Sequence, residues 1–406
     1  MTHQATVSRG WTKLAFDAGV ALTDLVESVH RSVSRAPGII GTPQDGPTAG
    51  LTGLIYQGVK NVIRLAGGGV DALLAQLGPM PGDAEPSRSR DAVLSALNGV
   101  VGDYLVATGS PLAIPMRLRM NGMPLQLKRR ALAAEISRPS GRVVILVHGL
   151  CLNDWRWNRK GHDHGTALVR DLGYTPLYLH YNTGLHISTN GRAFAEVLDV
   201  LVKQWPVPIE ELTIIGHSMG GLVARSACHY GREAAQTWRP HLRNLIFLGT
   251  PHHGVPLERG GQWVHLLIGK SPYTTPFTRL GSIRSAGITD LRYGNVVDED
   301  WEGHDRFNHV GDTRQVVPLP SDVRCHAIAG IAGPRVGGAI IGDGLVPVGS
   351  ALGQHKEPSR DLALPKSRLR IARSVNHMEL LNRPEVYKQI RKWLRPLEKG
   401  ALSAVQ

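Results

Sequence analysis

The sequence predicts an α/β protein with a mostly parallel central sheet, covered by helices on both faces and preceded by a helical N-terminal extension. Two observations support this fold class. From residue 116 onward, short β-prone runs alternate with helical stretches, a pattern typical of a parallel sheet between helices. Before residue 116, apolar residues recur every three or four positions, which indicates amphipathic helices. We therefore expect a helical extension over residues 1–115 and a second domain over residues 116–400.

The composition is that of an ordinary globular protein. The chain has 406 residues, of which 42% are hydrophobic and 19% are charged, so wholesale disorder is excluded. Its three cysteines are isolated in the sequence and predict neither a disulfide framework nor a cysteine zinc site; we expect them to be small buried side chains. No apolar run reaches the roughly 18 residues that a membrane-spanning helix needs.

The formal net charge is +13, but no basic cluster is interleaved with aromatic residues and no finger spacing is present. We therefore expect no nucleic-acid partner. The N-terminal residues lack a basic start followed by an apolar core, so no secretory signal is visible. We expect a cytoplasmic location, with peripheral membrane contact left open.

The N-terminal extension is expected to contain three helices. Trp11 to Val33 has helical apolar spacing, a second pattern runs from Leu51 to Leu77, and a third begins near Asp91, which would serve as N-cap or first-turn acid. Three roles stay open for these helices: packing on the next domain, pairing two copies into a homodimer, or contacting a membrane surface. Packing is favoured because an apolar helix stripe usually faces a core.

The second domain begins with a hairpin and continues as alternating strands and helices. Met116 to Met120, an Asn121-Gly122 turn and a run from Leu125 onward form the hairpin. Further strands are expected at Val143 to Val147, Pro176 to Leu179, Leu212 to Ile215, Leu245 to Leu248, Arg324 to Ile328 and Arg368 to Ser374. Helices are expected at about Gly165 to Leu172, Gly191 to Gln204 and Gly220 to His229, and from Pro384 to the end of the domain.

One segment carries a chemical signature. Gly216-His217-Ser218-Met219-Gly220 is a G-x-S-x-G motif between a β-prone run and a helical pattern, which is the context of a sharp strand-to-helix turn that projects a serine. A side chain at either glycine would collide with the neighbouring strand and helix. We therefore interpret Ser218 as a nucleophile rather than a solvated turn residue.

A serine nucleophile needs an anion-stabilising site and a base. The strand ending at Val147 leads into His148-Gly149-Leu150, where the glycine allows the backbone to turn, so the N–H groups of Leu150 and Met219 are the expected oxyanion donors. His148 is interpreted as holding this turn at the edge that faces the substrate.

The expected base and its acid partner follow later in the chain. Asp343 lies in a Gly342-Asp343-Gly344 turn after a late strand, and His377 lies between the last strand and the final helix. The order Ser218, Asp343, His377 is that of one of the three familiar serine triads. Alone, Asp-Gly is also a common hairpin turn. Alternative acids without the required chain position are Asp290, Asp298 and Asp300.

With these motifs and Leu248-Gly249-Thr250-Pro251-His252-His253-Gly254, the sequence resembles the α/β-hydrolase lipases and esterases, in particular GPI inositol-deacylase and bacterial lipase sequences. The resemblance covers about Arg142 to Leu394. It implies an α/β-hydrolase fold, hydrolysis of a small-molecule or lipid ester through an acyl-enzyme, and no cofactor. A thioesterase or acyltransferase acting on acyl chains stays open, as does a non-catalytic protein that docks a partner or membrane.

The remaining expectations concern the surroundings of the serine. His148, Gly149, His217, His252 and His253 are expected to contact the substrate, and a cap is expected over about residues 255–322, between two strands. Its apolar residues would line an acyl pocket or close a small core of their own. His162-Asp163-His164 could ligate a metal, but a solvated turn that caps the next helix is favoured, so no metal is expected.

Overall fold

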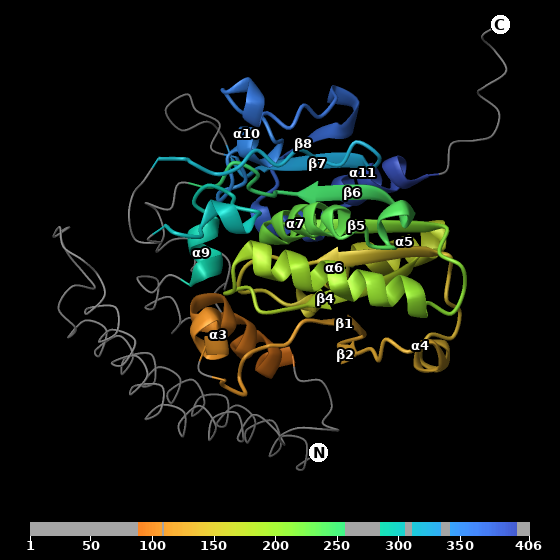
Figure 1. Ribbon diagram of the computed structural model, residues 1–406. Helices are drawn as coiled ribbons and strands as arrows, with labels where there is room; N and C mark the ends of the chain where they lie inside the picture. The colour runs from red at the N-terminus through yellow and green to blue at the C-terminus, as the bar shows by residue number, and fades with distance from the viewer. Residues whose placement is uncertain (1–87, 108, 256–284, 305–310, 334–341, 396–406) are drawn as a thin grey trace, which may run out of the picture.

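The computed structural model describes residues 88–107, 109–255, 285–304, 311–333 and 342–395 (Figure 1). The helices expected at Trp11 to Val33 and Leu51 to Leu77 lie outside these residues, as does much of the expected cap. In the described part of the chain, no helix combines the length and the apolar character needed to cross a bilayer.

One eight-stranded sheet forms the centre of the molecule. Its strand order is β2-β1-β4-β3-β5-β6-β7-β8. β1 pairs antiparallel with β2 and β4, and all other pairs are parallel. The strands are β1 Arg117–Met120, β2 Met123–Pro124, β3 Arg142–Val147, β4 Thr175–His180, β5 Glu211–His217, β6 Leu242–Leu248, β7 Arg324–Ile331 and β8 Leu369–Arg373. This is the α/β-hydrolase fold, as predicted.

The hairpin turn is tighter than predicted. Asn121 and Gly122 have φ of 53° and 80°, the left-handed pair that a two-residue turn requires. Met120 therefore pairs with Met123, and the second strand begins two residues before Leu125.

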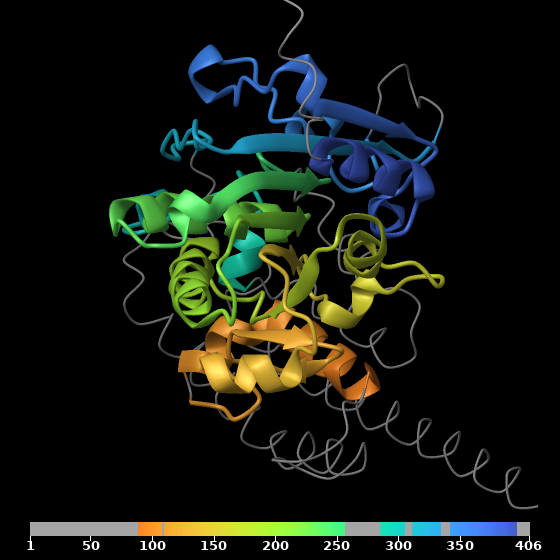
Figure 2. The same ribbon diagram turned by 90° about the vertical axis from the view of Figure 1, so that its right-hand side faces the viewer.

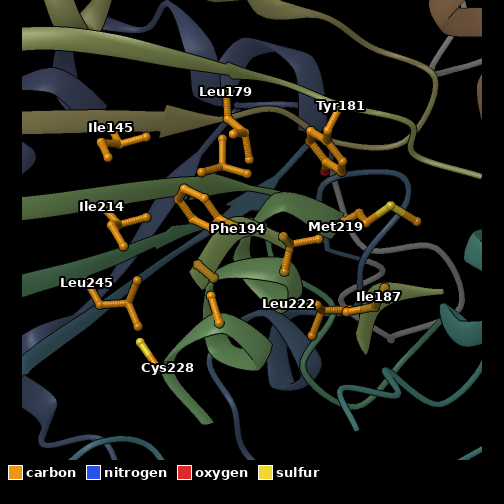
Figure 3. Packing of buried hydrophobic residues seen from close by; sticks show 14 of the residues in the cluster. Ile145, Leu179, Tyr181, Ile187, Phe194, Ile214, Met219, Leu222, Cys228 and Leu245 are labelled. Carbon is orange, nitrogen blue, oxygen red and sulfur yellow. The ribbon is translucent and has the colours of Figure 1, made fainter. Parts of the chain in front are cut away.

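Helices cover both faces of the sheet. They are α3 Arg88–Ala107, α4 Arg129–Glu135, α5 His164–Leu172, α6 Ile187–Gln204, α7 Met219–Glu233, α9 Ala286–Asp290, α10 Val348–Ala351 and α11 Pro384–Leu394. Figure 2 shows α6 and α7 on one face and α5 and α11 on the other. Side chains alternate along β3. Val143 and Ile145 join the core under α6 and α7, whereas Val144 and Leu146 join the core under α5 and α11. Figure 3 shows Ile145 in the first of these cores.

The helix α3 packs into the first of these cores. Val93, Ala96, Val100 and Leu105 are at most 3% exposed and belong to the same apolar cluster as β3 and α7. The predicted helix from Asp91 is thus confirmed. The domain boundary at residue 115 stays a prediction. The helix α3 precedes this boundary, and it nevertheless packs into the core of the sheet. As expected, Cys151, Cys228 and Cys325 are buried and unpaired by disulfides.

Candidate active site

Ser218 occupies a sharp turn between β5 and α7. Its backbone has φ 55° and ψ −126°, a conformation that a non-glycine residue adopts only under strain. A β-carbon added to Gly220 would lie 2.3 Å from the carbonyl oxygen of Val147 and 2.5 Å from that of His148. One added to Gly216 would lie 2.5 Å from the Cα of Gly221. The two motif glycines therefore have the steric role expected of them.

Asp343 and His377 meet at the same edge of the sheet. The Nδ1 of His377 lies 2.7 Å from Oδ2 of Asp343, and both side chains are buried. The other carboxylate oxygen accepts the backbone N–H groups of Leu345, at 3.0 Å, and Val346, at 2.8 Å. An ionised carboxylate only accepts hydrogen bonds, so Nδ1 of His377 donates, and in a neutral ring Nε2 would be the acceptor.

One hydrogen bond joins the serine turn to the histidine loop, and Gly249 lies against His377 and its acid partner. A β-carbon added to Gly249 would lie 2.9 Å from Oδ2 of Asp343 and 3.1 Å from Nδ1 of His377. Gly249 directly follows β6, next to β5. The ring of His217, the residue before Ser218, donates from Nε2 to the carbonyl oxygen of His377 over 3.0 Å. Ser218 Oγ and His377 Nε2 are both buried, with no hydrogen-bond partner among the described residues.

The loop after β3 faces the serine. A β-carbon added to Gly149 would lie 2.9 Å from Cβ and 3.4 Å from Oγ of Ser218. Only glycine allows this approach. The His148 ring lies 3.0 Å from the Gly149 carbonyl oxygen and stacks on Tyr181, and the Tyr181 hydroxyl donates to the His148 carbonyl oxygen. These contacts favour the interpretation of His148 as a residue that holds the turn.

Burial lowers the pKa of His148 to about 3 and that of His217 well below its ordinary value, so both rings are neutral at physiological pH. For His217 the nearby His377 adds to the effect of burial. His217 also packs edge-on against Trp157. A ring held in this way positions the His377 backbone; the substrate contact expected for His217 stays a prediction.

The alternative acids bind elsewhere. Asp290 accepts the backbone N–H of Ile187, at 2.8 Å, and lies 3.1 Å from the His186 ring. Asp298 pairs with Arg192. Asp300 accepts backbone N–H groups on both of its oxygens. Asp343 is the carboxylate that contacts His377.

His162-Asp163-His164 caps a helix, as favoured from the sequence. Asp163 is the N-cap of α5 and accepts the Thr166 N–H at 2.7 Å. The expectation of a solvated turn is wrong for His164, which is fully buried and bonds through Nε2 to the Leu380 carbonyl oxygen. Within the described ranges, no group of three or more His, Cys, Asp or Glu side chains could hold a metal ion.

His252 and His253 lie beside a buried arginine that the sequence analysis missed. Arg225, on α7, contacts the ring of His252, and both histidines line a cavity together with Arg225 and Arg314. The signal in the sequence was a charged residue inside the run Gly220–Cys228, whose other members are small or apolar. The described parts of the expected cap, residues 285–304 and 311–322, include α9, but its apolar residues from Trp263 to Leu280 lie outside the described residues.

One family model matches part of the chain. Residues 138–316 match the family model of the PGAP1-like alpha/beta domain, so the family resemblance read from the motifs is confirmed over this segment. No curated protein matches the chain.

Among solved structures, the chain is similar to the mature form of a Bacillus licheniformis lipase, with 15% identity and a TM-score of 0.41, covering 69% of this chain and 97% of that one. It is also similar to a Pyrobaculum calidifontis esterase, with 11% identity and a TM-score of 0.39, covering 78% of this chain and 93% of that one. A Pyrococcus furiosus esterase shows 15% identity and a TM-score of 0.36, covering 63% and 82%.

Proposed function

We propose that this chain, which carries a PGAP1-like α/β domain over residues 138–316, is a serine hydrolase of carboxylic esters, of the esterase or lipase type. The observation that carries the proposal is the 2.7 Å contact between His377 and Asp343, at the edge of the sheet where Ser218 occupies its strained turn. This combination supplies a hydroxyl group, an imidazole and a buried carboxylate for the roles of a serine triad.

In the proposed mechanism, Nε2 of His377 takes the proton of the Ser218 hydroxyl as the oxygen attacks the ester carbonyl. Asp343 keeps the other ring proton on Nδ1, so Nε2 stays available as acceptor, and it stabilises the imidazolium that forms. His377 then gives its proton to the departing alcohol, which leaves Ser218 acylated. Water, activated by the same ring, attacks the acyl-enzyme and releases the acid.

The negative charge that develops on the carbonyl oxygen needs fixed donors. The proposal assigns this role to the backbone N–H groups of Leu150 and Met219. Met219 is the first residue of α7, where the helix dipole favours negative charge. Leu150 directly follows Gly149, whose close approach to Ser218 brings this loop against the nucleophile. No cofactor has a part in these steps.

Turnover of p-nitrophenyl butyrate by wild type and two variants tests the proposal. Ser218→Ala should lower kcat by about 10⁴-fold or more, because only the oxyanion site and substrate binding remain. Ser226→Ala is the matched control, since Ser226 lies within α7 and, like Ser218, is fully buried with a hydroxyl that has no partner among the described residues. It should keep activity within a few-fold of wild type.

A fluorophosphonate probe should label wild type at Ser218 and leave Ser218→Ala unlabelled. Faster turnover of an acyl thioester than of the matched oxygen ester would indicate a thioesterase instead. If folded wild type neither turns over esters nor reacts with the probe, the non-catalytic interpretation is correct.

A further inference from the structure

The cavity that His252 and His253 line lies between the α/β core and the described end of the expected cap. Its volume is about 200 Å³. The charged and titratable residues that line it are Arg225, His252, His253, Arg314, Arg360 and Asp361. They come from α7, from the loop after β6, from the segment before β7 and from the segment before β8. Arginines thus outnumber carboxylates around the cavity.

Arg225 is a buried cation without a carboxylate. Arg225 is 6% exposed, and its Nη2 donates to the Val317 carbonyl oxygen at 2.7 Å. Its Nε has no partner among the described residues. The ion pairs nearby join Arg314 and Arg360 to Asp312, and none in the described part of the chain includes Arg225. An unpaired buried charge is costly, so a bound anion would stabilise this guanidinium.

His252 adds a second unused donor. Nη1 of Arg225 lies 3.3 Å from Nδ1 of His252. A guanidinium only donates, so Nδ1 accepts and the ring hydrogen must sit on Nε2. That Nε2 is buried and has no partner among the described atoms. Burial and then the charge of Arg225 lower the pKa of His252 well below its ordinary value, which keeps the ring in this neutral form.

The neighbouring groups do not satisfy these two donors. Arg314 donates to the His252 carbonyl oxygen at 2.8 Å and to the His253 ring at 3.1 Å, so it adds positive charge. Asp361 is the carboxylate in the lining, but its oxygens accept the backbone N–H groups of His355 and Ala363. Asp300 influences Arg225 through space, while its own oxygens bind backbone N–H groups.

We propose that this cavity binds an oxoanion, a carboxylate or phosphate group, through the Nε–H of Arg225 and the Nε2–H of His252. Arginine suits this ligand because its fork of donors matches the oxygens of carboxylate and phosphate groups. The anion has two possible sources: a free anion in solution, or the charged end of the ester substrate. Arg225 lies about two turns, roughly 10 Å, along α7 from Ser218, a distance that a short acyl chain spans.

Binding is measured on the full chain carrying Ser218→Ala, so its outcome does not depend on the proposed hydrolysis. Inorganic phosphate and glutarate are titrated at constant ionic strength, with chloride as the balancing salt, by calorimetry and by melting temperature. We expect saturable binding and a rise in melting temperature for at least one of them. Arg225→Gln and His252→Leu should each weaken binding at least tenfold. Arg119→Gln should not change it, because that half-buried arginine pairs with Asp91 and Asp154 and does not line the cavity.

A kinetic comparison distinguishes the two sources and does rest on the proposed function. If the substrate supplies the anion, Arg225→Gln should lower kcat/KM for mono-p-nitrophenyl glutarate at least tenfold more than for p-nitrophenyl butyrate. Equal effects on both esters, together with phosphate binding, would identify a free anion. Two results would overturn the proposal: neither anion binds saturably to the Ser218→Ala protein, or binding is unchanged in both folded cavity variants. If Arg225→Gln does not fold, His252→Leu and the titration of the parent protein still decide the question.

Discussion

Replacing Asp343 by asparagine tests whether the carboxylate controls the protonation of His377. In the structure, one oxygen of Asp343 accepts two backbone N–H groups and the other faces Nδ1 of His377. The asparagine oxygen should take the first position, because a flipped amide would leave the Leu345 and Val346 N–H groups unpaired at a cost of about 1–3 kcal/mol each. The amide NH₂ then points at Nδ1 of His377.

The consequence for the reaction follows from donor and acceptor roles. An NH₂ group only donates, so Nδ1 must accept and the ring hydrogen moves to Nε2. A protonated Nε2 cannot take the proton of Ser218. We expect kcat to fall by about 10⁴-fold, which corresponds to about 5 kcal/mol of transition-state stabilisation.

The assay is steady-state turnover of p-nitrophenyl butyrate, with circular dichroism and thermal melting to verify the fold. Asp290→Asn is the matched control, because Asp290 also accepts a backbone N–H and faces a histidine Nδ1, but it ends α9 and contacts the first residue of α6 instead of His377. It should lower the melting temperature and leave kcat within a few-fold. The reasoning fails if folded Asp343→Asn keeps a tenth of wild-type kcat, or if Asp290→Asn is the crippled variant.

Two further predictions concern stability. Gly220→Ala should lower the free energy of unfolding by about 1–3 kcal/mol or more in urea titrations, because its β-carbon would overlap the Val147 carbonyl oxygen. Gly349→Ala is the control and should change the free energy of unfolding little, because the nearest atom to its β-carbon would be 3.7 Å away. Equal effects would contradict the steric argument. Burial lowers the pKa of His148 and His164 from 6.5 to about 3, so below about pH 6.5 both rings take up a proton when the protein unfolds. The free energy of unfolding should therefore fall as the pH drops below 6.5, by at most about 1.4 kcal/mol per pH unit for each ring. His164→Gln should remove its share of this slope, and an unchanged slope would show that His164 is not neutral in the folded protein.

The strands were predictable because buried parallel strands leave a continuous apolar run in the sequence. β3 and β5 differ from the predicted ranges by at most two residues at either end. The helix α6 was predicted too short. It begins at Ile187 rather than Gly191, since the carboxylate of Asp290 accepts the Ile187 N–H. No local pattern reveals a cap supplied from so far along the chain.

Site residues that depend on local sequence were predicted, and those that depend on contacts between distant segments were missed. Ser218 is fixed by its own turn, whose glycines are adjacent in the sequence, and the fold then limits where its acid and base can occur. The bond from His217 to the His377 backbone joins two segments that only the folded sheet brings together.

Arg225 is the stronger case, because its surroundings come from three separate segments of the chain. On a helix, an arginine usually lies at the surface or snorkels to solvent. Here α7 is buried from Met219 to Cys228, so the guanidinium has no route to water along its own helix. The loop after β6 then supplies a ring that accepts one of its hydrogen bonds, and the segment before β7 supplies a carbonyl oxygen for another. Two N–H donors, the Nε–H of Arg225 and the Nε2–H of His252, have no partner among the described residues. No single stretch of sequence reveals this pair, and it is the reason we expect an oxoanion as the ligand.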